Sequence, residues 1–280
     1  MRVRVWGARG SIATPGADTA RYGGNTSCVE LRAADGSVVI LDAGTGIRPL
    51  GVRLRDEGHG PLHILLTHLH VDHLEGLGIF APIWSPETEL HLWGPSSPVS
   101  SLEDRITRYF SPPLFPVHLS EVPSNVTLHD APEGSWEIGG LTVTSAPIPH
   151  AGPTVGYRIQ EGDRSMAYVT DHEPALGADL ATAADEWISG HALAFGVDLL
   201  IHDTQYTDEE YPDHIGWGHS SASHVATFAE RAKVDRLWLF HHDPTHTDAD
   251  IDRMARRVRT RWGVDEDRCV AAAEGLEIEV

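Results

Sequence analysis

The residues best suited to chemistry in this chain form a short run at positions 67–73, which reads Thr-His-Leu-His-Val-Asp-His. The run follows the apolar stretch 62–66, which is typical of a buried strand. Side chains two residues apart point to the same side of an extended backbone. We therefore expect His68 and His70 to bind the same metal ion.

Asp72 and His73 lie where we expect the strand to turn into a helix over Leu74–Phe80. This turn would point their side chains toward a neighbouring position, so that one loop serves two metal ions. The alternative is a solvated loop with ordinary polar residues. It is the weaker interpretation, because three histidines and an aspartate would then crowd at one strand end without a task.

Three later segments also end an apolar stretch with a histidine or an aspartate. These residues are His150, Asp171, and the adjacent pair His241 and His242. Each of them alone could be a turn or capping residue. Together with the run 67–73, we interpret them as further metal ligands at the C-terminal ends of strands.

Short apolar segments separated by turn residues recur in both halves of the chain and predict strands. They cover residues 3–6, 28–31, 38–41, 63–66, 142–145, 155–159, 166–169, 199–202 and 237–240. Helical spacing of apolar residues follows Ser220 or Ser221, Asp248, and the glycines of 44–46. Strand-rich halves with interspersed helices, without a glycine-rich nucleotide loop, favour a layered α/β sandwich over a doubly wound sheet.

The chain of 280 residues is strongly acidic, with 21 Lys and Arg against 41 Asp and Glu and a formal net charge of −20. Such a charge repels polyanions, and the dense basic stretch 253–261 is typical of a solvated helix face. We therefore expect a small substrate and no stable nucleic-acid partner. The composition favours one compact domain over residues 1–280.

The chain has no apolar run of membrane-spanning length. Residues 1–6 are typical of a first strand rather than of a signal peptide, so we expect a cytoplasmic protein with no membrane partner. Cys28 and Cys269 lie in apolar, strand-like runs. We expect both to be buried free thiols rather than a disulfide.

The order of these residues along the chain resembles the metallo-β-lactamase superfamily. The resemblance spans nearly the whole chain and rests on the run 67–73, on Leu41-Asp42-Ala43-Gly44, and on the strand-end residues. It implies an α/β fold, the four-layer αβ/βα sandwich, with a binuclear metal centre at the strand ends.

The resemblance also implies a role for each ligand. One metal would be bound by His68, His70 and His150, the other by Asp72, His73 and His241, with Asp171 as the bridge. His241 is preferred to His242 because it follows the apolar strand directly. Asp42 would either support a metal-binding histidine from behind or cap the following helix.

The ligand types restrict the choice of metal. Imidazole and carboxylate ligands without a thiolate suit zinc, and also manganese, iron or cobalt. We expect two divalent ions, with Zn²⁺ as the first choice and Mn²⁺ as the alternative. Two such ions about 3.5–4 Å apart would hold a bridging hydroxide as the nucleophile of a hydrolysis.

Two further segments, 199–206 and 216–223, resemble the phosphodiesterase branch of the superfamily, which includes ribonuclease Z and cyclic-nucleotide phosphodiesterases. By this resemblance Asp203 orients His219, and His219 protonates the leaving alkoxide as the general acid. Asp203 stands where ribonuclease Z usually has Glu, and Ser221 stands in place of Thr, which leaves the orienting geometry open. His219, Asp203 and Asp72 form the predicted catalytic set.

The glycine-rich run 7–12 resembles the opening of bacterial phosphodiesterase-like members. The backbone amides of this run, Arg9 or Asn25 could reach a phosphate or a base. The simpler interpretation is that the glycines form turns between the first strands.

The leading hypothesis is a metal-dependent hydrolase, most specifically a phosphodiesterase for a small phosphodiester such as a cyclic nucleotide. A ribonuclease Z-like transfer-RNA 3′-end endonuclease is the nearest alternative, although no glycine-rich arm separates Asp171 from His219. A lactone or thioester hydrolase would not need the Asp203–His219 pair. A metal-binding domain without activity is a further alternative, and the resemblance implies a homodimer.

Overall fold

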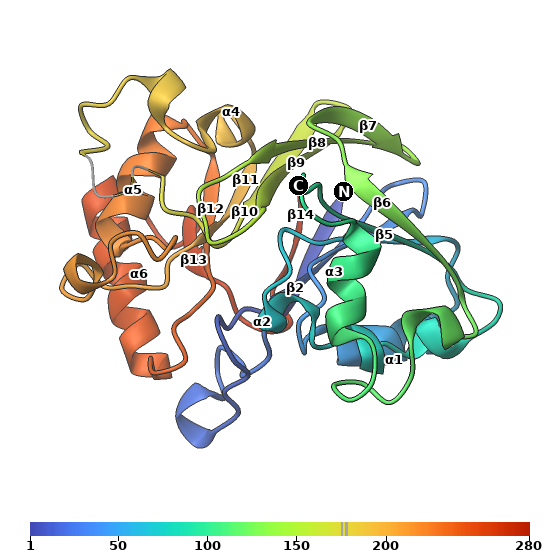
Figure 1. Ribbon diagram of the computed structural model, residues 1–280. Helices are drawn as coiled ribbons and strands as arrows, with labels where there is room; N and C mark the ends of the chain where they lie inside the picture. The colour runs from blue at the N-terminus through green and yellow to red at the C-terminus, as the bar shows by residue number, and fades with distance from the viewer. Residues whose placement is uncertain (175, 177–178) are drawn as a thin grey trace.

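A computed structural model describes residues 1–174, 176 and 179–280 (Figure 1). Two seven-stranded sheets face each other. The first has the order β14 (Glu277–Glu279), β1 (Arg2–Gly7), β2 (Cys28–Arg32), β3 (Val38–Leu41), β4 (Leu62–Leu65), β5 (Glu89–Pro95) and β6 (Asn125–Ala131). The second has the order β13 (Cys269–Ala271), β12 (Arg236–Phe240), β11 (Leu199–Asp203), β10 (Arg164–Val169), β9 (Val155–Glu161), β8 (Leu141–Pro147) and β7 (Gly134–Ile138).

Helices cover the outer faces of the two sheets, which confirms the predicted αβ/βα sandwich (Figure 1). The α-helices are α1 (Ile47–Glu57), α2 (Val71–Leu74), α3 (Leu102–Tyr109), α4 (His191–Ala194), α5 (Ala222–Arg231) and α6 (Asp248–Trp262). Short 3-10 helices cover Ala17–Thr19, Leu77–Ile79, Ala81–Trp84, Leu119–Glu121, Asp185–Trp187 and Tyr211–Asp213.

Apolar side chains separate these layers in three clusters. The central cluster lies between the sheets and joins, for example, Val3 and Leu31 of the first sheet to Tyr157 and Phe240 of the second. The other two clusters lie between each sheet and its helices. A strand such as β3, in which all four residues are buried, fits this arrangement because both of its faces are covered.

The two sheets share one pairing pattern, and this pattern explains where polar residues gather. Three antiparallel pairs are followed by three parallel pairs, which join β3 to β6 in one sheet and β10 to β13 in the other. Parallel neighbours end at the same edge of a sheet. The loops after β3, β4, β10, β11 and β12 therefore begin at these common edges.

All predicted strands overlap observed ones, but the predicted helix over Leu74–Phe80 is wrong. Helix α2 covers Val71–Leu74 instead, and a 3-10 turn follows at Leu77–Ile79. The α-helix ends early because the backbone N–H of Gly76 donates to the carbonyl oxygen of Ala43, at 2.9 Å, rather than to its own helix. Asp72 and His73 consequently lie within the helix and not ahead of it.

Both cysteines are buried free thiols, as predicted. Within the described part of the chain, no helix combines the length and the apolar character that crossing a membrane requires.

Candidate metal centre

The predicted ligands of both sheets meet at one end of the strands. They are His68 and His70 after β4, Asp72 and His73 on α2, His150 after β8, Asp171 after β10 and His241 after β12. Their possible ligand atoms form two groups, and the atoms of each group lie within 4.8 Å of one another. The fold thus brings together residues that are up to 173 positions apart in the sequence.

The first group contains His68, His70, His150 and Asp171. His150 Nε2 lies 3.1 Å from His70 Nδ1, and both His150 Nε2 and His68 Nε2 approach Asp171 Oδ2, at 3.7 and 3.6 Å. His70 is exposed, whereas His68 and Asp171 are buried. This group therefore opens to solvent on the side of His70.

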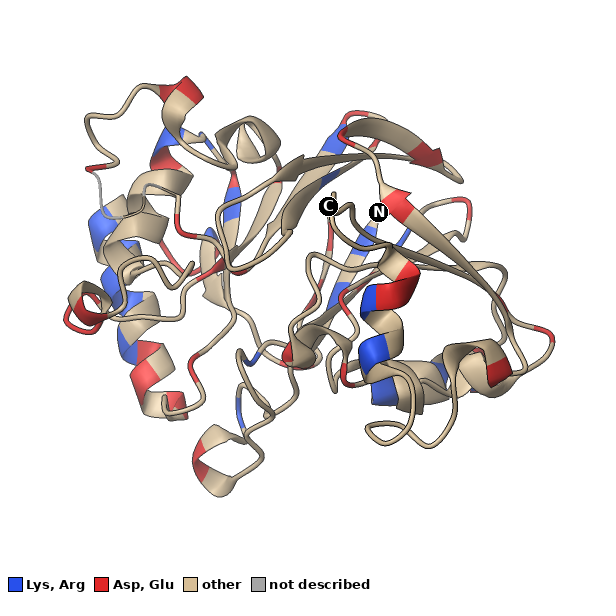
Figure 2. Cartoon of the chain, viewed as in Figure 1, with Lys and Arg blue, Asp and Glu red and all other residues tan. Residues whose placement is uncertain are grey.

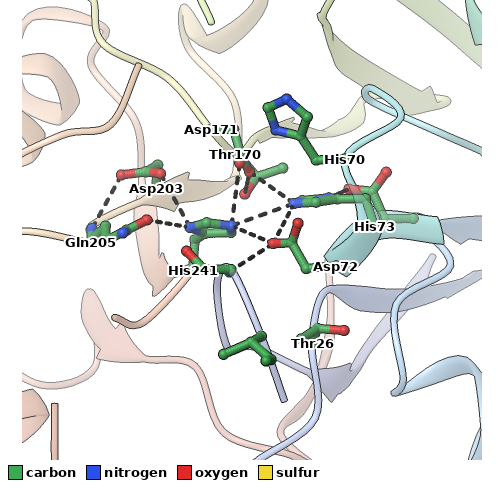
Figure 3. Close-up of polar contacts among 12 residues, drawn as sticks. Thr26, His70, Asp72, His73, Thr170, Asp171, Asp203, Gln205 and His241 are labelled. Carbon is green, nitrogen blue, oxygen red and sulfur yellow. Dashed lines mark hydrogen bonds and ion pairs between the residues drawn. The ribbon is translucent and has the colours of Figure 1, made fainter. Parts of the chain in front are cut away.

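The second group contains Asp72, His73, Asp171 and His241, all of them buried (Figure 3). His73 Nε2 lies 3.3 Å from Asp72 Oδ2 and 3.2 Å from Asp171 Oδ1. His241 Nε2 lies 3.3 Å from Oδ2 of each aspartate. Asp171 therefore faces both groups with its two oxygens, which is the position that a bridging carboxylate needs.

This donor set fits two divalent cations. Among the described residues, the buried Nε2 of His68 has no hydrogen-bond partner, although it points at the carboxylate of Asp171. A buried ring nitrogen without a partner is costly unless something else occupies it. Imidazole and carboxylate donors without thiolates suit zinc or manganese. His68, His70 and His150 would hold one ion, Asp72, His73 and His241 the other, and Asp171 both.

The far nitrogen of each buried imidazole is fixed by a neighbouring oxygen. The partners are Asp42 Oδ2 for His73 at 2.8 Å, Thr67 Oγ1 for His68 at 3.1 Å, Gln205 Oε1 for His241 at 2.9 Å and Gly218 O for His150 at 3.2 Å. Such contacts orient metal-binding histidines and set which nitrogen is free. Asp42 thus supports His73 from behind, which is one of the two roles expected for it.

Three residues of this centre have left-handed backbone conformations directly after strands. Asp42 follows β3 with φ 61°, His241 follows β12 with φ 58°, and Asp171 lies two residues after β10 with φ 51°. Such conformations cost energy in residues other than glycine and cluster at functional sites. They turn each side chain from the strand direction toward the centre.

The charged side chains of the second group shift one another's pKa values. Burial raises the pKa of Asp171, but the charges of His241 and His73 bring it well below its usual range. Burial lowers the pKa of His241, whereas Asp171 and a hydrogen bond with Asp72 raise it to about 9. His68 differs, because burial and repulsion from His73 hold its pKa well below the usual value. The cationic histidines thus balance buried carboxylates that divalent ions would otherwise neutralise.

Asp203 and His219 form a hydrogen-bonded pair beside the two ligand groups. The Nδ1–H of His219 donates to Asp203 Oδ2 at 2.6 Å, and the ring of His219 stacks on His241 at 5.0 Å between centroids. The other carboxylate oxygen of Asp203 accepts the backbone N–H of Ser220 at 2.8 Å. The shorter aspartate therefore reaches the histidine, which answers the question of geometry that the sequence left open.

Two other predicted candidates lie outside the centre. The Nε2–H of His242 donates to the carbonyl oxygen of Ala272 at 2.8 Å, so this histidine supports the fold. Arg9 is fully buried, and its guanidinium donates to the carbonyl oxygens of Gly23 and His246 at 2.9 and 2.7 Å. The suggestion that Arg9 reaches a phosphate is wrong, because the side chain is fully buried and its Nε and Nη1 donate to backbone carbonyl oxygens.

The backbone near Arg9 does contact the centre, which sequence reasoning missed. Ser11 donates its backbone N–H to Asp72 Oδ2 at 2.7 Å. Gly10 packs so closely on the ring of His241 that a Cβ there would overlap it. The only sequence signal for these contacts was the density of glycines in the run 7–12.

Sequence reasoning also missed Glu173, a buried carboxylate two residues after Asp171. It accepts the hydroxyl of Tyr211 at 2.6 Å and the backbone N–H groups of Gly216 and Gly218 at 2.9 and 3.0 Å. These bonds fix the loop that carries Gly218 O to His150 and that leads into His219. No periodicity or motif distinguishes this glutamate from a surface residue, because its partners are backbone groups of a distant loop.

Comparisons with known proteins agree with this geometry. Residues 38–242 match the family model described as the beta-lactamase superfamily domain. A ribonuclease Z of Mycobacterium sp. (strain KMS) is 27% identical over 248 residues, which cover 82% of this chain and 81% of that protein. A diphosphatase from the PhnP family has a TM-score of 0.71 at 20% identity, over 100% of this chain and 97% of that one. Zn(2+)-bound PqqB from Methylobacterium extorquens has a TM-score of 0.68 at 19% identity, over 100% of both chains.

Proposed function

Because this chain belongs to the metallo-β-lactamase superfamily, we propose that it is a binuclear metal-dependent phosphodiesterase for a small phosphodiester such as a cyclic nucleotide. The observation that carries the proposal is the Asp203–His219 pair beside both ligand groups. A hydrolase that expels an alkoxide needs an acid at this place, because an alkoxide leaves poorly without a proton.

The two ligand groups support two divalent ions, with zinc as the first choice and manganese as the alternative. The donor set supports this assignment, as does zinc in the related fold of PqqB. When bound, such ions supply Lewis acidity that activates water and withdraws charge from phosphodiester oxygens. The protein contributes fixed ligands, because each buried imidazole is held by an oxygen on its far side.

His219 is the proposed general acid. Its Nδ1–H donates to Asp203 Oδ2, so the Nε2 nitrogen is the atom that holds the proton for the leaving oxygen. Among the described residues, this Nε2 has no hydrogen-bond partner. The buried carboxylate of Asp203 orients the ring through this hydrogen bond, and the backbone N–H of Ser220 fixes the carboxylate in turn. Asp72 would act as a metal ligand, and its Oδ2 also accepts the backbone N–H of Ser11.

A hydrolysis panel tests the proposal. Zinc- and manganese-loaded protein would be given cyclic nucleotides, an aryl phosphodiester, a lactone, a thioester and a precursor transfer RNA. We expect turnover of the small phosphodiesters. Selective cleavage of the lactone or the thioester would contradict the proposal, and no cleavage at all would favour a binding domain.

A ribonuclease Z-like endonuclease is the second candidate, because a ribonuclease Z is 27% identical over 82% of this chain. The net charge of −20 weighs against it, since a folded RNA is a polyanion. Specific 3′-end cleavage of the precursor transfer RNA, faster than turnover of small phosphodiesters, would decide for this candidate.

A further inference from the structure

A cavity of about 460 Å³ lies against the metal centre on the side of α3. Its lining includes His68 and His70 of the first ligand group and also Arg105, Arg108 and Tyr109 of α3. This volume falls in the range of small-molecule sites. A molecule bound at His70 would therefore extend toward α3.

Apolar side chains also line this cavity. Val71 and Leu114 are 56% and 70% exposed, and Leu69, Leu74 and Pro153 complete the lining. Exposed large apolar side chains gathered around a cavity are typical of a ligand site. The hydroxyl of Tyr109 donates to the carbonyl oxygen of Glu75 at 2.6 Å, which holds the ring in place. The middle of the cavity thus suits an organic body such as a nucleoside.

Neither of these two arginines forms an ion pair among the described residues. Arg105 donates only to backbone, with Nη2 2.5 Å from Pro95 O and Nε 3.2 Å from Ser101 O. Arg108 is exposed and has no polar partner within the described part of the chain. Elsewhere, arginines such as Arg53 and Arg257 contact carboxylates.

The position of these arginines on one face of α3 favours joint binding of an anion. Residues three apart in a helix lie on the same side, so Arg105 and Arg108 face the cavity one turn apart (Figure 2 shows the basic segments of α3). Burial lowers the pKa of Arg105, and the charge of Asp130 opposes this shift only in part. In a chain of net charge −20, two cations without carboxylate partners beside the candidate centre are available for an anionic ligand.

We propose that this cavity selects phosphodiesters that carry a second phosphate group, which Arg105 and Arg108 bind beyond an apolar, nucleoside-like body. The inference rests on the proposed function, because it assigns the scissile phosphate to the metal centre. Guanidinium groups bind phosphate through several N–H donors at once, which favours phosphate over a single weakly charged group. A cyclic nucleotide with only the scissile phosphate leaves both arginines unused.

The test compares two dinucleotides that differ only in the terminal phosphate, d(ApA) and its 5′-phosphorylated form d(pApA). With zinc-loaded wild-type protein, we expect kcat/KM for d(pApA) to exceed that for d(ApA) about tenfold, mainly through KM, as one charged hydrogen bond would give. Arg108→Gln should remove this preference, whereas Arg55→Gln should keep it. Arg55→Gln is the matched control, because Arg55 is an exposed arginine that contacts only Asp56.

Binding provides a readout that does not depend on turnover. Calorimetric titration of zinc-loaded His219→Ala protein with both dinucleotides should show the same preference, and adding Arg108→Gln should remove it. Equal binding of the two dinucleotides, or a preference that persists in Arg108→Gln, would overturn the inference. If wild-type protein cleaves both dinucleotides equally, the inference fails and the proposed function stands. If it cleaves neither dinucleotide and no phosphodiester of the hydrolysis panel, the proposed function fails, and the binding preference still decides whether the cavity is an anion site.

Discussion

Replacing Asp203 by Asn tests how the proposed acid is held. Asp203 Oδ2 accepts the Nδ1–H of His219 at 2.6 Å, while Oδ1 accepts backbone N–H groups of Ser220 and Gln205 at 2.8 and 3.1 Å. The amide oxygen of Asn can keep both backbone bonds. Its NH₂ group then faces His219 Nδ1 and cannot accept the hydrogen bond that the carboxylate accepts, so the contact that orients the ring is lost.

The magnitude follows from the bond that is lost. A buried hydrogen bond between charged groups contributes about 1.5–3 kcal/mol, which corresponds to about 10- to 100-fold in rate if it acts in the transition state. The loss should appear only where the leaving group needs a proton. The assay therefore compares kcat/KM for two phosphodiesters, one with a p-nitrophenoxide leaving group and one with a simple alkoxide.

We expect Asp203→Asn to lower kcat/KM for the alkyl ester within that range and to change the p-nitrophenyl ester by less than about threefold. His219→Ala is the control, since it should show the same dependence on the leaving group with a larger loss. Bound metal and the melting temperature should stay near wild type. Equal losses on both esters would refute the acid role and point to a general disturbance of the centre.

Three further predictions concern the surroundings of the centre and a histidine of strand β4. Glu173→Gln replaces one acceptor oxygen by an NH₂ group that faces the backbone N–H groups of Gly216 and Gly218. We therefore expect the unfolding free energy to fall by about 1–3 kcal/mol and turnover to weaken. An unchanged unfolding free energy in urea titrations would contradict this prediction. Gly218→Ala should lower the zinc content of the protein, because Gly218 has a φ of 85° and a Cβ there would overlap the ring of His150. Full zinc content by mass spectrometry would contradict this, since it would show that the loop moves to accommodate the methyl group. Burial, followed by repulsion from His91 and His129, lowers the pKa of His63 to about 4. Since the unfolded state has a histidine pKa of about 6.5, it binds a proton that the folded state does not, so the unfolding free energy should fall as pH drops from about 6.5 to 4. His63→Phe should flatten this dependence in denaturant titrations at several pH values, and an unchanged slope would exclude His63 as its source.

The ligands were the most predictable part of the site, because their chemistry leaves marks in short stretches of sequence. His68, His70, Asp72 and His73 are contiguous, and a strand-end histidine or aspartate stands out after apolar residues. The choice of His241 over His242 followed from strand register alone, and the structure places His241 with the ligands and His242 against Ala272.

Contacts that depend on distant backbone groups could not be predicted. The helix expected at Leu74–Phe80 ends because Gly76 bonds to Ala43, and Glu173 matters because of the amides of a loop more than forty residues away. Strands such as β6 and β14 were missed, because half-exposed or very short segments become strands only through their neighbours. The sequence suggested a phosphate-binding role for Arg9, whereas in the structure its guanidinium donates to backbone carbonyl oxygens.

The central claim is that these residues hold two metal ions that act together on a phosphodiester. Metal-free protein would be titrated with zinc while hydrolysis of a small phosphodiester is followed. The account predicts that activity rises to a plateau at two zinc ions per chain. A plateau at one ion, or no hydrolysis at any ratio, would contradict it.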